Sequence, residues 1–67
     1  MRLVINGEDR KIDDGVRDVA ALVAWLGLET RKVAVERNLE IVPRSLHAAT
    51  PVVEGDRFEI VTFIGGG

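Results

Sequence analysis

The stretch DVAALVAWLG, residues 18–27, is the strongest indication of the fold, because it places a helical pattern between two β-prone regions. Asp18 can cap the first turn with its carboxylate, and Gly27 can adopt the left-handed conformation that ends helices. Between them, apolar residues recur at intervals of three and four, which puts them on one face of a helix. These residues are Val19, Leu22, Val23 and Leu26. The sequence therefore predicts one short amphipathic helix.

Strands are predicted on both sides of this helix. Residues 2–5 and 8–12 flank Asn6-Gly7, the pair favoured in tight hairpin turns. After the helix, strands are predicted at residues 32–36, 40–42 and 57–63, and Pro43 restricts the middle one to an edge. A helix that follows a hairpin must bury its apolar face on the sheet that the later strands complete. We therefore expect an α+β domain with one helix.

The size and composition of the chain restrict its class. Sixty-seven residues make one small domain, and 46% hydrophobic residues can supply its core. We expect residues 1–64 to form this domain and residues 65–67 to be a flexible glycine tail. Without cysteine the chain has no disulfide and no thiolate nucleophile.

The charges and apolar runs point away from nucleic acid and membranes. The net charge is -2, and no basic stripe for nucleic acid is apparent. The longest apolar runs are far shorter than the roughly 20 residues that span a bilayer. The N-terminus resembles a strand rather than a signal peptide. We expect a soluble, cytoplasmic protein.

Few residues could support catalysis. The single histidine, His47, has no second ligand at metal spacing, so no metal site is expected. Ser45 lies two residues away, but no third group is placed to orient the imidazole. We interpret Ser45 and His47 as surface residues. The chain is therefore not expected to be an enzyme.

Three glycines, Gly65, Gly66 and Gly67, follow the last predicted strand. Such a tail can approach another surface closely, which makes the carboxylate of Gly67 the candidate reactive group. Adenylation by ATP would activate this carboxylate, and sulfur could then displace AMP to leave a thiocarboxylate. Strand alternation puts Val61 and Phe63 on the open face of the sheet. Together with Ile64 they are the candidate partner-binding residues.

Several segments resemble one protein family. They are Val33–Asn38, Ile41–Arg44, Gly55–Ile60 and the terminal Gly66-Gly67, and they are similar to the ThiS family, the bacterial sulfur carriers of thiamine thiazole biosynthesis. The resemblance implies a ubiquitin-like β-grasp fold, with a mixed sheet of four to five strands packed on one helix. It also implies that an E1-like adenylyltransferase uses ATP to adenylate Gly67, and that a sulfur-donor enzyme takes part in forming the thiocarboxylate. Thiazole synthase would then receive the sulfur, and no cofactor would be bound.

Other functions stay open at this point. The chain could carry sulfur for molybdopterin or cysteine synthesis, or could be a ubiquitin-like modifier joined to lysines through Gly67. It could also be a small interaction domain whose terminal glycines have no role. The mass of the intact protein separates these alternatives, because only a carrier exchanges an oxygen of Gly67 for sulfur.

Overall fold

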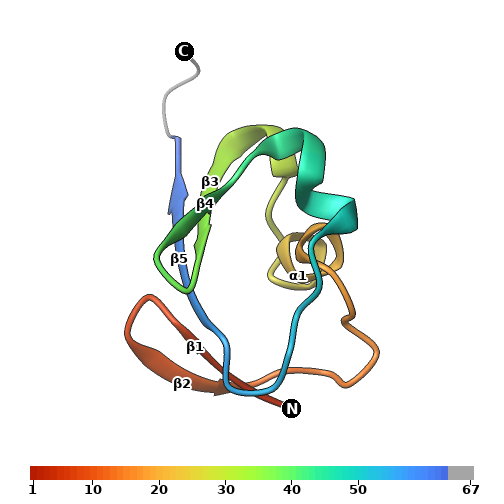
Figure 1. Cartoon of the computed structure of the whole chain (residues 1–67), viewed down its shortest axis with the longest axis vertical. Helices are drawn as coiled ribbons and strands as arrows, with labels where there is room; N and C mark the ends of the chain where they lie inside the picture. The colour runs from red at the N-terminus through yellow and green to blue at the C-terminus, as the bar shows by residue number, and fades with distance from the viewer. Residues whose placement is uncertain (64–67) are drawn as a thin grey trace.

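The computed structural model describes residues 1–63 of the chain. Along the chain (Figure 1) the elements are β1 (Arg2–Ile5), β2 (Glu8–Lys11), α1 (Val19–Trp25), the 3₁₀ helix η1 (Thr30–Lys32), β3 (Val33–Arg37), β4 (Glu40–Val42), the 3₁₀ helix η2 (Arg44–Ala49) and β5 (Arg57–Thr62). The predicted glycine tail, residues 65–67, lies outside the described residues, as does residue 64 of the predicted domain.

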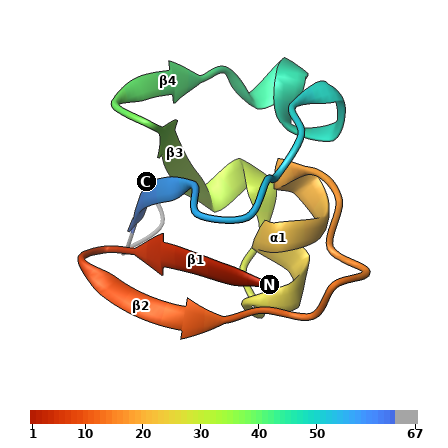
Figure 2. The ribbon, with the colours of Figure 1, turned by 60° about the horizontal axis from the view of Figure 1, so that its bottom comes forward.

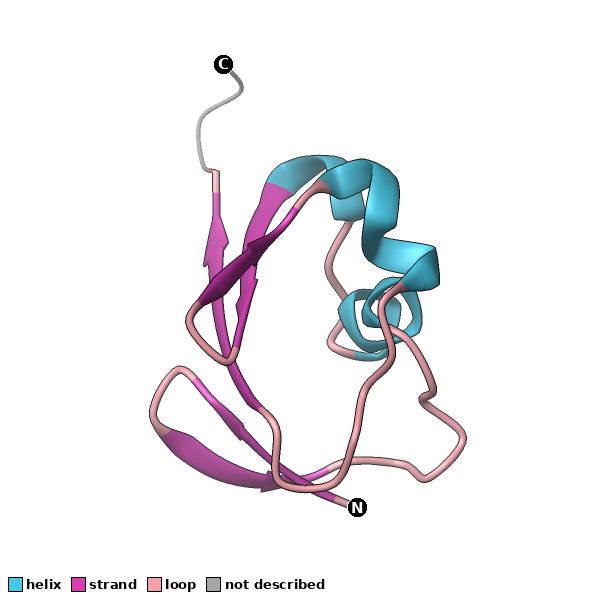
Figure 3. Ribbon diagram, in the orientation of Figure 1, coloured by secondary structure: helices cyan, strands magenta, loops and turns pink. Residues whose placement is uncertain are grey.

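Five strands in the described part of the chain form one mixed sheet in the order β2-β1-β5-β3-β4. The central pair, β1 and β5, is parallel, and the other neighbouring pairs are antiparallel. Helix α1 and the two 3₁₀ helices lie on the same side of this sheet (Figures 2 and 3). This arrangement confirms the predicted α+β, β-grasp fold. In this arrangement the last strand, β5, occupies the middle of the sheet.

Both tight turns contain residues with left-handed backbone. Asn6 and Gly7, between β1 and β2, have φ of 51° and 82°, and the predicted hairpin is confirmed. Asn38 and Leu39, between β3 and β4, have φ of 50° and 73°. The outer strands β2 and β4 are therefore each joined to their neighbour by a two-residue connection, which fixes the register of the sheet edges.

Helix α1 begins and ends as its sequence predicts. The backbone N–H of Ala21 donates to the Asp18 carboxylate at 2.8 Å, so Asp18 is the N-cap. Gly27 follows the helix with φ of 78°, and its N–H donates to the Ala24 carbonyl. Most of the predicted apolar face is buried, with Leu26 at its margin.

A single apolar core lies between α1 and the sheet. Phe58, from the middle strand, is completely buried in it, and full burial of such a side chain contributes about 1.5–3 kcal/mol. The other buried hydrophobic residues are Leu3, Ile5, Ile12, Val16, Val19, Leu22, Val23, Val33, Val35, Val42, Val52 and Ile60. The core therefore holds β5, the strand that leads toward the glycines, by its buried face.

The predicted surface position of His47 is wrong, because its side chain is only 2% exposed. The segment around it is a six-residue 3₁₀ helix, η2, which packs against α1 and turns the imidazole inward. The ring Nε2 lies 3.2 Å from the Val42 carbonyl oxygen, while Nδ1 has no partner among residues 1–63. His47 therefore belongs to the packing of η2 against α1, with its ring directed toward the Val42 carbonyl.

Candidate functional site

The strand β5 presents different residues on its two faces. Phe58 and Ile60 point toward α1 and are buried, whereas Val61 and Phe63 are each 60% exposed. The predicted alternation of this strand is confirmed. Val61 and Phe63 therefore lie on the face of the sheet that is not covered by α1. Ile64, the third predicted partner-binding residue, lies outside the described residues.

Neighbouring strands extend this exposed surface. Ala34 on β3 is opposite Val61, and Glu36 on β3 is opposite both Glu59 on β5 and Ile41 on β4. Ile41 is 76% exposed, so its side chain is available for contact. The open face is defined here by five residues of three adjacent strands and by Phe63, which directly follows β5. The five are Ala34, Glu36, Ile41, Glu59 and Val61.

A hollow of about 250 Å³ borders the open face where β5 ends. Ala34, Ile41 and Phe63 line it together with Pro43 and Arg44. Its walls are mostly apolar, and it lies beside the last described residue. A partner that bound the chain near the glycines would therefore find an apolar recess next to Phe63.

Hydrogen bonds on both sides hold the last part of β5. The Phe63 N–H donates to the Lys32 carbonyl at 2.8 Å on the β3 side. On the β1 side, the Asn6 amide binds the backbone of Ile60 at both its N–H and its C=O. The segment that precedes the glycines therefore starts from a fixed point. This role of the Asn6 side chain could not be predicted, since its position in a turn already explained an asparagine.

A polar cluster fixes the loop that leads into β5. The Asp56 carboxylate accepts hydrogen bonds from Arg37 Nε at 2.9 Å, Asn38 Nδ2 at 3.1 Å and the Val53 N–H at 2.9 Å. Burial alone would raise the pKa of the Asp56 carboxyl. The hydrogen bonds from Asn38, Val53 and Arg37, with the positive charge of that arginine, outweigh burial and hold this pKa below its ordinary value. The cluster joins the β3–β4 turn to the start of β5.

Residues 1–63 include no group of three or more histidine, cysteine or acidic side chains placed to hold a metal ion. Ser45 is exposed while His47 is buried. As for membranes, α1 is seven residues long, and none of the described helices has the length and apolar character of a membrane span.

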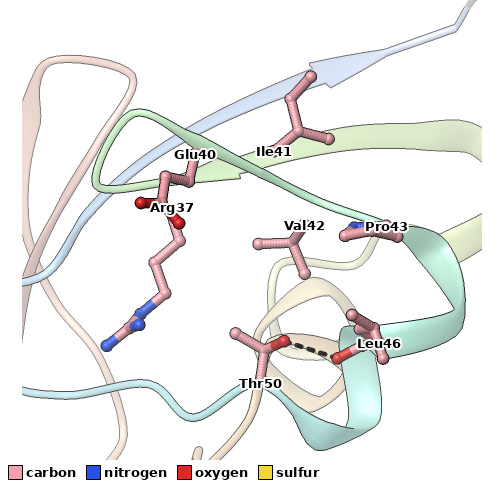
Figure 4. A pocket seen from close by; sticks show the side chains of 7 residues that line it. All are labelled: Arg37, Glu40, Ile41, Val42, Pro43, Leu46 and Thr50. Carbon is pink, nitrogen blue, oxygen red and sulfur yellow. Dashed lines mark hydrogen bonds between the residues drawn. The ribbon is translucent and has the colours of Figure 1, made fainter.

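Another hollow, of about 200 Å³, lies between β4 and η2 (Figure 4). The Thr50 hydroxyl in its wall donates to the Leu46 carbonyl at 2.7 Å, and the Arg37 side chain is engaged by Asp56. Among the predicted site residues that the structure describes, neither Val61 nor Phe63 lines this hollow. Its lining within residues 1–63 is Arg37, Glu40, Ile41, Val42, Pro43, Leu46 and Thr50. The predicted site residues that the structure describes, Val61 and Phe63, lie on the open face instead.

The fold and the exposed end of its central strand define a ubiquitin-like β-grasp domain. A family model described as the ThiS family matches residues 3–67, and the chain belongs to this family. It is 37% identical, over 65 residues, to the sulfur carrier protein ThiS of Bacillus subtilis, covering 97% of this chain and 98% of that protein. This chain superposes with a TM-score of 0.83 on the crystal structure of the thiamine biosynthesis protein ThiS from Geobacter metallireducens. The two sequences are 35% identical, and the superposition covers both chains completely.

Longer relatives also contain a similar segment. The chain is 58% identical over all 67 residues to a protein of Paramagnetospirillum magneticum named thiazole synthase. A thiazole synthase of Magnetococcus marinus matches at 40% identity over the same length. The chain spans only 20% of the length of each of these two relatives.

Proposed function

We propose that the chain is a sulfur carrier protein of thiamine thiazole biosynthesis and that the carboxylate of Gly67 carries the sulfur. The observation that supports this most directly is the match over nearly the full length of both proteins to the sulfur carrier of Bacillus subtilis. The position of the glycines agrees with it. They follow a strand that is fixed by the core on one face and by hydrogen bonds at both edges.

The proposed chemistry takes place on the carboxylate in four steps. A carboxylate oxygen of Gly67 attacks the α-phosphate of ATP, and pyrophosphate leaves. A sulfur nucleophile supplied by a donor enzyme then attacks the acyl carbon, and AMP leaves with the oxygen that joined it to the acyl group. A thiol reductant then attacks the donor sulfur and forms a disulfide with it, which releases the acyl-bound sulfur as a thiocarboxylate at the end of the chain. The thiocarboxylate transfers its sulfur to a carbon electrophile.

Partner enzymes supply the catalytic groups in this scheme, so we assign the chain the role of protein co-substrate rather than enzyme. An E1-like adenylyltransferase would consume the ATP, and the chain itself would hold no cofactor. Thiazole synthase would accept the sulfur, an assignment supported by the two relatives that bear this name. We place this chemistry in the cytoplasm, where ATP is available to the activating enzyme.

Val61 and Phe63 are proposed to contact these partners, together with Ile64. Exposed apolar residues that gather on one surface mark contact sites for other proteins. Here they lie next to the segment that must enter the partner's active site. A carrier needs such a surface because its tail alone offers few side-chain contacts.

Reconstitution tests the proposal. The chain would be incubated with the adenylyltransferase, ATP and a sulfur donor, and its intact mass would then be measured. A mass gain equal to the exchange of one oxygen for one sulfur, located at Gly67, is expected. A variant that lacks Gly67 is the matched control and should gain nothing. Appearance of the chain in high-mass conjugates, with no sulfur gain, would show a protein modifier instead.

A further inference from the structure

Two carboxylates lie opposite each other on the open face. Glu36 on β3 and Glu59 on β5 are register partners in the antiparallel pair, and both belong to the outward-facing set of their strand. Like charges directly opposite on one face of a sheet destabilise it. The fold therefore retains an unfavourable pair at the centre of an exposed surface.

Neither carboxylate has an ion-pair partner within residues 1–63. The nearby Arg37 binds Asp56 at 2.9 Å on the other face of the sheet, and Lys32 binds Glu29 at 3.0 Å. Arg57 lies two residues before Glu59 on the same strand face, and it makes no ion pair within 4 Å with any carboxylate of the described residues. A cation that approached from outside would therefore meet two carboxylates with free acceptor oxygens.

Apolar side chains border this acidic pair on two sides, toward the end of β5 and toward β4. Ala34 and Val61 form the next register pair toward the end of β5, and Phe63 follows them. On the other side of Glu36 lies Ile41. A partner that covered these apolar side chains would exclude water from the surroundings of the two carboxylates. The attraction between the carboxylates and a cation of the partner would then be stronger.

We propose that Glu36 and Glu59 bind one arginine on the docking surface of thiazole synthase, while apolar side chains of that surface cover Val61, Phe63 and Ile41. The inference rests on the proposed function. We infer that the partner on the open face is thiazole synthase, because two relatives with this name contain a segment similar to the chain. Arginine fits better than lysine, since its planar guanidinium has five donors that can reach two carboxylates at once.

The anchor would act on specificity and on the rate of encounter as well as on affinity. Complementary charges steer association and set the register of an interface. Because the glycines must enter an active site, the register of the sheet on the synthase decides where Gly67 arrives. An acidic pair that fixes this register is a reason for the fold to retain two opposed carboxylates.

Titration calorimetry with purified thiazole synthase from the organism that encodes the chain tests this inference. The variants Glu36→Gln and Glu59→Gln should each bind about tenfold more weakly than the original chain, and binding of the original chain should weaken with salt. Glu8→Gln, an exposed substitution on the outer strand β2, is the matched control and should bind like the original. Thermal unfolding should show that the two variants are as stable as the original chain or more so.

The outcomes separate this inference from the proposed function. Binding by the original chain with unchanged affinity of both glutamine variants would overturn the anchor and leave the carrier function intact. Absence of any dependence on salt would also overturn it. If the original chain did not bind the synthase at all, the proposed function would lose its acceptor and the anchor would fail with it.

Discussion

The side chain of Asn6 takes the place of a strand neighbour for Ile60. The Ile60 N–H donates to Asn6 Oδ1 at 2.7 Å, and Asn6 Nδ2 donates to the Ile60 carbonyl at 3.1 Å. Strand β1 pairs with β5 only through Val4 and Ile5, so the backbone of Ile60 extends past the end of its partner. The amide satisfies both polar groups that the shorter strand leaves open.

Substitution of Asn6 tests this relationship. Asn6→Gly keeps the left-handed backbone of the turn but leaves Ile60 without its two partners, which should cost about 1–3 kcal/mol of stability. Asn6→Ala should cost about 1–2 kcal/mol of stability more than Asn6→Gly, because alanine is strained at the positive φ of this residue. Urea unfolding measures both changes. Equal stability of Asn6→Gly and the original chain would show that the amide contributes nothing.

The Asp56 cluster predicts a dependence of stability on pH. The folded state lowers the pKa of this carboxyl from 3.8, so its contribution is present above that value and is lost as pH falls through the lower folded value. The free energy of unfolding should therefore decrease below about pH 4. In Asp56→Asn the decrease should be shallower, and stability at pH 7 should be lower by about 1–3 kcal/mol.

The exposed Asp9 provides a control for this experiment. It pairs with Arg2 at 3.4 Å, and both side chains are largely in solvent, so Asp9→Asn should lower the stability at pH 7 by no more than about 1 kcal/mol. The same acid slope in Asp56→Asn as in the original chain would show that another group is responsible for it.

Local signals in the sequence were enough to predict most of the fold. Asn6-Gly7, the Asp18 cap and the spacing of apolar residues in α1 each act over a few residues, and each was confirmed. The exposure of Phe63 followed from alternation along a single strand. Patterns of this kind are readable because their physical cause lies within one turn or one strand.

Features that depend on distant residues could not be predicted. His47 was placed at the surface because a lone polar residue in a loop is usually exposed, whereas the packing of η2 on α1 buries it. Asp56 follows a glycine in the loop before β5, and its partners Arg37 and Asn38 lie 19 and 18 positions away. Nothing in the local sequence indicates that these three side chains meet.

Phe63 should matter more for binding than for folding. Its side chain is largely exposed, so Phe63→Ala should change the free energy of unfolding by less than about 0.5 kcal/mol. Loss of a buried aromatic anchor from a protein interface costs about 2 kcal/mol or more, so affinity for the adenylyltransferase should fall by at least tenfold. Affinity is measured by calorimetry and stability by thermal unfolding.

Val53→Ala is the matched control for this substitution. Val53 is an exposed apolar residue before β5 and outside the open face, so its removal should leave binding unchanged. Unchanged affinity of Phe63→Ala would remove the docking role of this residue, and a large loss of stability would assign it to the core instead.

The intact mass of the natural protein, isolated from sulfur-replete cells, shows whether Gly67 carries sulfur. We predict a fraction whose mass exceeds that of the chain by the exchange of one oxygen for one sulfur, with fragmentation placing the change at Gly67. Removal of Gly67 should abolish this fraction while the thermal midpoint stays the same. The contrary result is a natural protein in which Gly67 is joined to a further residue and no sulfur-containing form is found. It would show that the carboxylate of Gly67 does not carry sulfur.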